Sequence, residues 1–279
     1  MQPMPPRPYR AKPRTLVQAP MSFAQRVSTP DGALLATFVY GRLRPGSVPV
    51  LVLHGNGGTH YTFDAVIGRL LDAGLAVIAV DARAQGQSTR GTAALTYEQM
   101  AEDALVVLDA LGVERAHVLG HSDGGIEALL LARDHGDRVA SIVAGGANLT
   151  PEGVVDEWDT QGSVRANRDW ASWLAQGDLP SSIDPTLLPS TEEALLDAEL
   201  LQLMLDEPHI EASSLASISC PACVLVGEHD CITPEETNAI ADGIPSARLV
   251  TVPGVGHSLP RQAPDSVALQ VLTNVMLAR

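Results

Sequence analysis

The chain has 279 residues, 45% of them apolar, and a formal net charge of −15. A chain of this length and apolar content can bury a large core, which excludes general disorder, and its negative charge argues against binding nucleic acid or an anionic membrane. No apolar run approaches the roughly 20 residues of a membrane span and no signal-peptide layout opens the chain, so we expect a cytoplasmic protein.

The first 148 residues predict a leader followed by the first part of an α/β domain. Residues 1–20 contain six prolines and four basic residues with no acidic partner, which predicts a disordered or extended leader. Strands and helices then alternate, which is typical of a mostly parallel sheet with right-handed crossovers. The predicted elements are a hairpin of strands 23–27 and 33–40, strand 49–54, helix 64–72, strand 75–81, helix 97–111 behind a capping box at Thr96 and Gln99, a strand ending at Leu119, the helix after it, and strand 139–144.

Residues 149–215 break this alternation. They contain helical pieces such as 194–205 but no apolar strand, all three tryptophans, and fourteen acidic residues against two arginines. We interpret the segment as a helical lid inserted into the domain, whose core is then 21–148 and 216–279. The alternation resumes after the insertion with strand 222–227, helix 234–242, strand 247–252 and helix 264–277.

The motif Gly-His-Ser-Asp-Gly-Gly lies between the strand ending at Leu119 and a helix. This is the G-x-S-x-G nucleophile elbow in the strand–turn–helix context that the motif requires. Small residues at Gly120 and Gly124 leave room for a strained turn that exposes the serine hydroxyl. The elbow predicts Ser122 as a nucleophile.

A serine hydroxyl needs a base, and the base needs an orienting carboxylate. On this topology both should follow the serine in the chain, the acid before the histidine. Asp230 follows one late strand and His257 follows the last, so both are expected at the carboxyl edge of the sheet. Taken singly, His257 could be an ordinary loop histidine and Asp230 a helix cap. Glu228 is the rival acid.

The segment His-Gly-Asn-Gly-Gly at 54–58 follows a strand and keeps the backbone free of bulky side chains. Backbone N–H groups there can stabilise negative charge that develops on a substrate oxygen. We predict the N–H groups of Asn56 and Asp123 as the oxyanion hole. A plain glycine-rich turn is the alternative, and a dinucleotide site is disfavoured because the third glycine of that fingerprint is absent.

Three cysteines cluster near one predicted strand, at Cys220, Cys223 and Cys231. The first two form a C-x-x-C pattern, but it precedes a strand and no second pair completes a zinc site. We expect reduced, partly buried thiols and no metal or cofactor.

These motifs together resemble the α/β-hydrolase superfamily over residues 22–279. The resemblance implies an eight-stranded, mostly parallel sheet flanked by helices, with a lid inserted after the sixth strand. The loop 81–88 looks like the D-x-R-G-x-G-x-S loop of that family, with Ala84 and Gln85 where glycine and often histidine stand. The loop is structural in the family, so the departure is expected to alter the shape of the rim more than the chemistry.

The aspartate that follows the nucleophile resembles the elbow of amino-acid-ester hydrolases of the valacyclovir-hydrolase type. The resemblance implies that Asp123 binds a substrate ammonium group, which an acidic lid would attract. The alternative is that Asp123 only favours the helix N-terminus, where a negative charge is stabilised by about 0.3–1 kcal/mol.

We therefore expect a cofactor-independent serine hydrolase that cleaves a small ester, including amino-acid esters, through an acyl-enzyme. The expected substrate contacts are Gly55, Asp123, Trp158, Trp170 and Trp173, although tryptophans at helical spacing are often core residues. The alternatives are a carbon–carbon bond hydrolase with the same triad and a ligand-binding protein without turnover. The oligomeric state is not encoded in any pattern we recognise.

Overall fold

An eight-stranded sheet forms the centre of the part of the chain that the structure describes. The structure is a computed structural model that describes residues 19–176 and 188–278. The strand order is β1-β2-β4-β3-β5-β6-β7-β8; the β1–β2 and β2–β4 pairs are antiparallel and the others parallel. The mostly parallel sheet is therefore confirmed. The strands are β1 (Met21–Ser28), β2 (Leu34–Tyr40), β3 (Val50–Leu53), β4 (Val77–Val80), β5 (Ala116–His121), β6 (Val139–Gly145), β7 (Ala222–His229) and β8 (Ala247–Gly256).

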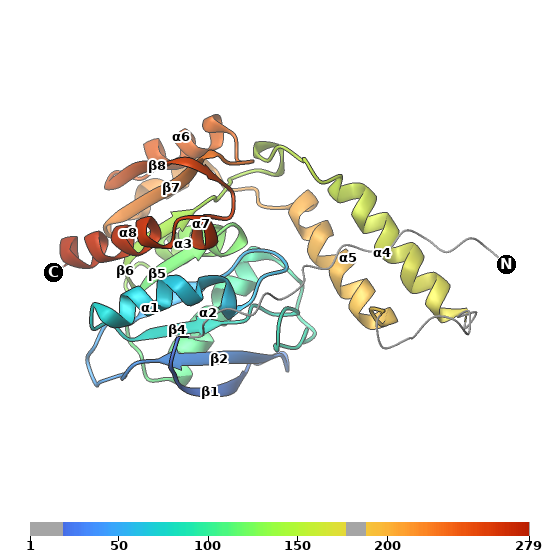
Figure 1. The fold of residues 1–279 in the computed structure, drawn as a ribbon, viewed down its shortest axis with the longest axis horizontal. Helices are drawn as coiled ribbons and strands as arrows, with labels where there is room; N and C mark the ends of the chain where they lie inside the picture. The colour runs from blue at the N-terminus through green and yellow to red at the C-terminus, as the bar shows by residue number, and fades with distance from the viewer. Residues whose placement is uncertain (1–18, 177–187, 279) are drawn as a thin grey trace. The chain divides into compact units, whose positions relative to one another are not determined.

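Helices cover both faces of this sheet, with α1 and α8 on one face and α2 and α3 on the other (Figure 1). The bounds of α1 and α8 are those predicted from the sequence. The elements outside the sheet are η1 (His60–Phe63), α1 (Asp64–Asp72), α2 (Tyr97–Ala110), α3 (Asp123–Asp134), η2 (Pro151–Gly153), η4 (Ala212–Ser217), α6 (Pro234–Gly243), α7 (Leu259–Gln262) and α8 (Pro264–Leu277).

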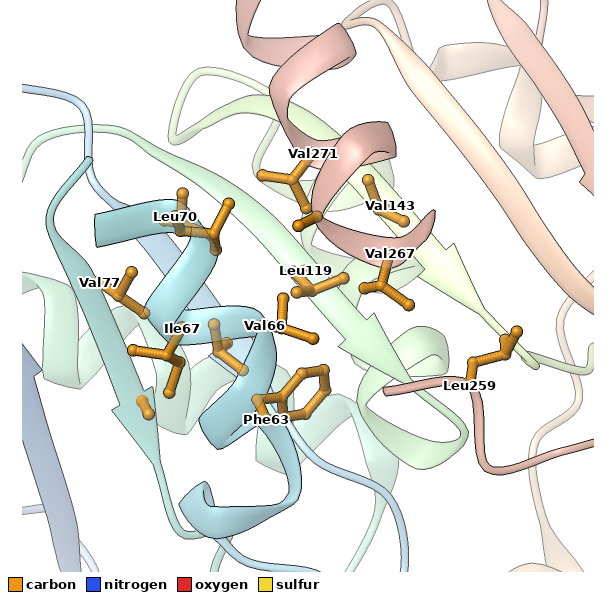
Figure 2. Packing of buried hydrophobic residues seen from close by; sticks show 14 of the residues in the cluster. Phe63, Val66, Ile67, Leu70, Val77, Leu119, Val143, Leu259, Val267 and Val271 are labelled. Carbon is orange, nitrogen blue, oxygen red and sulfur yellow. The ribbon is translucent and has the colours of Figure 1, made fainter. Parts of the chain in front are cut away.

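The core beneath α1 and α8 holds the central strand β5 in place. One buried cluster contains Val66 and Leu70 of α1, Val267 and Val271 of α8, and Leu119 of β5, which lies between the two helices (Figure 2). Burying one large aliphatic side chain fully contributes about 1.5–3 kcal/mol. This packing fixes the carboxyl end of β5, where the chain turns into α3.

The start of α2 differs in one detail from the sequence prediction. The Thr96 hydroxyl accepts a hydrogen bond of 3.0 Å from the Gln99 backbone N–H, as expected for an N-cap. The Gln99 side chain, however, donates to Asp103 Oδ1 at 3.1 Å. Only the N-cap half of the predicted capping box is formed, because Asp103 offers Gln99 a charged acceptor one turn along the helix.

The segment Asp156–Glu207 forms a compact unit separate from the sheet domain. Its helices are α4 (Thr160–Ala175) and α5 (Thr191–Asp206), and α5 begins earlier than the predicted 194–205 because Ser190 and Glu193 form a capping box. Trp170 and Trp173 pack with Ala194 between the two helices. This unit is narrower than the insertion predicted at 149–215.

The predicted leader at 1–20 lies outside the described residues, apart from its last two positions. Within the described ranges, no helix combines the length and the apolar character needed to cross a membrane.

Candidate active site

Ser122 occupies a strained turn between β5 and α3. Its φ is +56° and its ψ is −121°. A non-glycine residue held in such a region costs about 1–3 kcal/mol. The turn is stabilised by hydrogen bonds from Ser122 N to Gly145 O (2.7 Å) and from Ile126 N to Ser122 O (3.1 Å). The hydroxyl is thereby fixed at the N-terminus of α3.

Two glycines make this turn sterically possible. A Cβ on Gly120 would lie 1.8 Å from the carbonyl oxygen of Gly124, and one on Gly124 would lie 2.1 Å from the carbonyl oxygen of Leu53. These are backbone atoms that cannot move aside. The motif therefore needs glycine at both positions, because the backbone of α3 packs directly on β3 and β5.

The structure brings Ser122, His257 and Asp230 together at the carboxyl ends of β5, β8 and β7. His257 Nε2 lies 3.0 Å from Ser122 Oγ, and His257 Nδ1 lies 2.6 Å from Asp230 Oδ1. Glu228, the rival acid, is exposed instead, and its carboxylate accepts a hydrogen bond from the Gly254 backbone N–H at 2.7 Å. The acid beside the imidazole is Asp230.

The charges of this pair follow from their contacts. Burial raises the pKa of Asp230, but hydrogen bonds from His257 and from the N–H groups of Ile232 and Gly227 outweigh it and lower that pKa overall. Burial lowers the pKa of His257, but Asp230 and the Cys231 thiol outweigh it and raise that pKa. Asp230 is thus ionised at neutral pH. In neutral His257, Nδ1 donates to Asp230 and Nε2 is left to accept a proton from Ser122.

His121, the residue before Ser122, has a role that the sequence did not suggest. Its Nε2 lies 2.6 Å from the backbone carbonyl oxygen of His257, and the two rings are 4.9 Å apart. Burial lowers the pKa of His121 to about 4, so the ring is neutral and Nε2 donates this hydrogen bond. His121 therefore anchors the backbone that carries His257.

The loop after β3 touches the elbow. A Cβ on Gly55 would lie 2.6 Å from Ser122 Cβ, so only glycine permits this approach. His54 holds the loop: its Nε2 accepts a hydrogen bond from Ala82 N at 2.9 Å, so Nδ1 carries the proton donated to Gly55 O at 2.8 Å. The predicted oxyanion residue Asn56 follows directly, beside the candidate nucleophile.

Asp123 is buried rather than open to solvent. Its side chain is 3% exposed, accepts hydrogen bonds from the side chains of Tyr97 and Asn56, and has a pKa raised to about 6 by burial. One carboxylate oxygen, Oδ2, has no hydrogen-bond partner. The structure thus joins the two predicted oxyanion residues through their side chains. Protein groups, not solvent, surround the carboxylate that was expected to meet a substrate cation.

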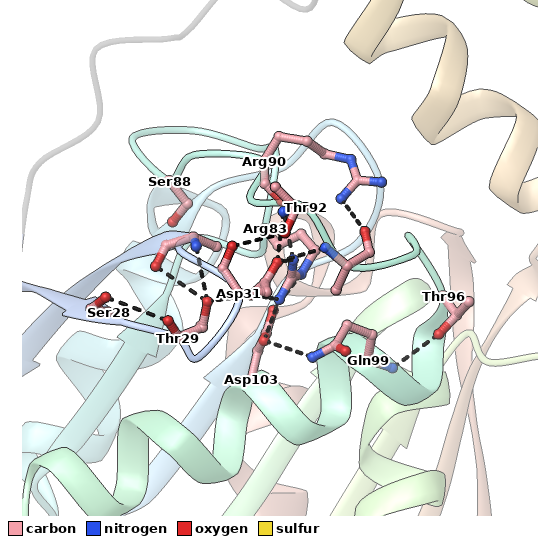
Figure 3. Close-up of polar contacts among 12 residues, drawn as sticks. Ser28, Thr29, Asp31, Arg83, Ser88, Arg90, Thr92, Thr96, Gln99 and Asp103 are labelled. Atoms are coloured by element: carbon pink, nitrogen blue, oxygen red, sulfur yellow. Dashed lines mark hydrogen bonds and ion pairs between the residues drawn. The ribbon is translucent and has the colours of Figure 1, made fainter.

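The loop at 81–88 is anchored by a buried arginine. Arg83 donates to Asp31 Oδ2 at 2.8 Å and to both oxygens of Asp103 at 2.7 Å (Figure 3). Ala84 follows with φ at +65°, the left-handed region where the related family has glycine. Gln85 is 5% exposed, and its Oε1 accepts a hydrogen bond of 2.7 Å from Gly57 N. Gln85 thus supports the loop that carries Asn56.

The tryptophans lie in the helical unit and differ from one another in environment. Trp170 is fully buried, its ring 5.3 Å from that of Trp173, and its indole N–H donates to Pro189 O at 3.3 Å. Both rings belong to the core of the unit. Trp158 is 58% exposed. Of the three, it alone presents most of its ring to solvent.

The chain matches the family model for the alpha/beta hydrolase fold over residues 48–165. It is 30% identical over 247 residues to a protein of Caulobacter sp. (strain K31) named "Putative carbamate hydrolase RutD", a match that covers 80% of this chain and 88% of the relative. The chain belongs to the alpha/beta hydrolase family. This membership makes the protein a hydrolase and implies a small-molecule substrate, which confirms the fold class and the enzyme class predicted from the sequence.

Other hydrolases match this chain over most of its length. Rhodomycin D methylesterase DauP of Streptomyces sp. (strain C5) is 26% identical, over 84% of this chain and 93% of its own. A hydrolase from Pseudomonas aeruginosa PA01 superposes with a TM-score of 0.71 at 25% identity, covering 91% of this chain and 98% of its own. A thermophilic esterase from Thermogutta terrifontis superposes with a TM-score of 0.70 at 25% identity. This match covers 92% of this chain and 99% of the esterase.

Proposed function

We propose that this hydrolase cleaves a small carboxylic ester through an acyl-enzyme formed on Ser122. The observation that carries the proposal is the unbroken hydrogen-bonded series from Ser122 Oγ through both nitrogens of His257 to Asp230 Oδ1. An ionised carboxylate at one end and an alcohol at the other make the imidazole a base aimed at the alcohol.

The reaction uses these groups twice. His257 Nε2 takes the Ser122 proton as Oγ attacks the ester carbonyl, and the electron pair of the C=O bond moves to oxygen. The tetrahedral intermediate collapses, and the departing alkoxide takes the proton back from Nε2. A water molecule then gives a proton to Nε2 and attacks the acyl carbon, and Ser122 leaves with that proton. Asp230 stays ionised throughout and stabilises the imidazolium.

The backbone N–H groups of Asn56 and Asp123 are proposed to bind the oxyanion. The close approach of Gly55 to Ser122 and the hydrogen bond between the Asn56 and Asp123 side chains support this assignment. Loss of one such donor typically costs about 10²–10³ in kcat. The raised pKa of Asp123 also reduces the negative charge beside the oxyanion below about pH 6.

A fluorophosphonate probe and p-nitrophenyl acetate test the proposal together. Wild type should be labelled on Ser122 and should hydrolyse the ester. Ser122→Ala should lose both properties while its far-ultraviolet circular dichroism stays the same. The matched control is Ser258→Ala, an exposed serine beside His257 that should remain labelled and active. Undiminished ester hydrolysis by Ser122→Ala would refute the assignment.

A carbamate substrate is the second candidate, because several of the relatives bear the name carbamate hydrolase. A carbamate presents a carbonyl that the same nucleophile and base can attack. Rates with matched acyl esters, amino-acid esters and carbamates would rank the classes. A β-diketone in the same panel tests carbon–carbon bond hydrolysis, and turnover of the diketone alone would overturn the ester proposal.

The helical unit Asp156–Glu207 is proposed to act as a lid that selects substrates. The position of this unit in the chain supports the proposal. The unit is inserted between β6 and η4, outside the strands that carry the candidate catalytic residues. Replacement of 156–207 by a short Gly-Ser linker should preserve hydrolysis of p-nitrophenyl acetate and weaken discrimination between short and long acyl chains. Unchanged discrimination would contradict the lid role.

A further inference from the structure

Three different metal-binding side chains meet where β7 and β8 end. One ligand atom each from Asp230, Cys231 and His257 lie within 4.8 Å of one another. The Cys231 thiol also lies within hydrogen-bonding reach of the His257 ring. Across residues 19–176 and 188–278, no other group of three histidine, cysteine or acidic side chains meets this criterion.

We propose that Asp230, Cys231 and His257 form an inhibitory binding site for a thiophilic divalent cation, best matched by Zn²⁺. The donors are one thiolate sulfur, one imidazole nitrogen and one carboxylate oxygen, the three ligand types that zinc accepts in proteins. Hard cations such as Mg²⁺ and Ca²⁺ prefer oxygen alone, so the thiol makes the site selective against them. A water molecule would complete four-coordination, as in other zinc sites with three protein ligands.

Two of the ligands are held in place and the third can adjust. Asp230 is 1% exposed, and its oxygens accept hydrogen bonds from Ile232 N at 3.2 Å and Gly227 N at 3.4 Å. Cys231 follows it directly and is 6% exposed. The His257 side chain is 21% exposed. The imidazole is therefore the ligand that moves.

Metal binding requires the three ligand atoms, which lie within 4.8 Å of one another, to reach the separations that zinc imposes. Zinc holds nitrogen and oxygen at about 2.0 Å and sulfur at about 2.3 Å, which separates neighbouring ligand atoms by roughly 3.3 Å or more. The Nδ1–Oδ1 distance of 2.6 Å must therefore open by less than an ångström. The missing side chain at Gly146 leaves room on that side, because a Cβ there would already lie 3.1 Å from Nδ1 and 3.4 Å from Asp230 Oδ2.

Occupation of this site is incompatible with ester hydrolysis. A neutral imidazole carries one proton, which in the structure lies on Nδ1 between His257 and Asp230. A cation on Nδ1 sends that proton to Nε2, and Cys231 gives up its thiol proton to solvent. Nε2–H cannot accept the proton of Ser122, so the nucleophile loses its base. The site thus acts as a switch that responds to metal rather than to substrate.

A cobalt titration tests binding without relying on activity. Co²⁺ bound to thiolate gives a sulfur-to-metal charge-transfer absorption that oxygen and nitrogen ligands alone do not give. We expect this absorption in wild type and in Ser122→Ala, and competition by Zn²⁺ should remove it. The matched variants are Cys231→Ala and Cys220→Ala, since Cys220 is 7% exposed and precedes β7 instead of following it. Only Cys231→Ala should lose the absorption.

Zinc inhibition gives the second readout. Zn²⁺ should inhibit ester hydrolysis by wild type and by Cys220→Ala, and EDTA should restore it. Cys231→Ala should need at least about 10-fold more zinc for the same inhibition, since even indirect partners of a metal ligand change affinity by 10–100-fold. Absence of the cobalt absorption in wild type, or its persistence in folded Cys231→Ala, would overturn the proposal. An active enzyme with no cobalt absorption would refute the metal site alone, and an inactive enzyme with the absorption would refute the ester proposal alone.

Discussion

The side-chain oxygen Oε1 of Gln85 accepts a 2.7 Å hydrogen bond from the backbone N–H of Gly57. The bond links the loop after β4 to the loop after β3. Gly57 is the neighbour of Asn56, whose N–H we assign to the oxyanion. If Asn56 binds the oxyanion as proposed, the buried Gln85 positions the loop that carries it.

Gln85→Ala is expected to lower kcat about tenfold with little change in KM, because the bond positions the loop that carries a proposed transition-state contact. Steady-state kinetics with p-nitrophenyl acetate measure the two constants. Gln87→Ala, an exposed glutamine in the same loop, is the control and should behave as wild type. A rise in KM alone would show that Gln85 acts on binding and not on the oxyanion loop.

The dependence of kcat/KM on pH should report His257. The imidazole must be neutral to accept the Ser122 proton, so activity falls as the pH drops below its pKa. Asp230 and Cys231 raise that pKa above the ordinary 6.5, so the acid limb of the profile should lie above pH 6.5. Asp230→Asn should move the limb to lower pH and reduce kcat by up to about 10⁴. A wild-type limb below pH 6.5 would contradict the raised pKa.

Asp123→Asn should stabilise the protein at alkaline pH. The folded-state pKa of about 6 is above the ordinary 3.8, so the folded protein holds a proton that the unfolded chain has lost, and stability falls as pH rises from about 4 through 6. The neutral asparagine removes this penalty, which amounts to up to about 3 kcal/mol. Urea unfolding at pH 8 should show the gain, and at pH 5.5 the gain should be smaller.

Glu127→Gln is the matched comparison for that experiment. Glu127 lies one turn along α3 and is 2% exposed, and burial followed by the charges of Asp123 and Asp103 raises its pKa well above the ordinary 4.5. Its carboxyl therefore keeps its proton to a higher pH than a free glutamate does. By the same linkage, Glu127→Gln should also gain stability relative to wild type as the pH rises, and a difference that does not change with pH would contradict the raised pKa.

Gly124→Ala should prevent folding or reduce stability severely, since its Cβ would lie 2.1 Å from the Leu53 carbonyl oxygen. Soluble yield and the urea midpoint measure the effect. Gly68→Ala is the control: a Cβ there meets nothing within 4 Å, and alanine in the interior of α1 should add up to about 1 kcal/mol. Equal stability of the two variants would mean that the elbow tolerates a side chain.

Much of the fold follows from local sequence signals. Pro264 and the apolar spacing after it define α8, and the elbow glycines define the turn at Ser122. The end of β8 was missed: the strand continues to Gly256 beyond the predicted 252. β8 contains Pro253, which an edge strand tolerates because its N–H can face the open side without losing a ladder hydrogen bond.

Of the candidate site, only the residues that lie at the ends of predicted strands could be grouped from the sequence. Parallel strands place their carboxyl ends at one edge, which is why Ser122, Asp230 and His257 could be grouped from chain order. The contacts of Gln85 with Gly57 and of His121 with His257 depend on side-chain rotamers and join residues 28 and 136 positions apart in the sequence. No periodic pattern encodes such contacts. The burial of Asp123 could not be predicted for the same reason, because its partners Tyr97 and Asn56 come from the start of α2 and from the loop after β3.

The ends of the inserted segment are tied together by the backbone hydrogen bond of 2.9 Å from Ile210 N to Leu149 O. The polypeptide thus leaves and re-enters the sheet domain at adjacent points. A segment of any length can be inserted between these two points without changing the order of the strands. On the lid role proposed above, segments grafted from related hydrolases at this junction would change substrate preference while the strands that carry Ser122, His257 and Asp230 stay the same.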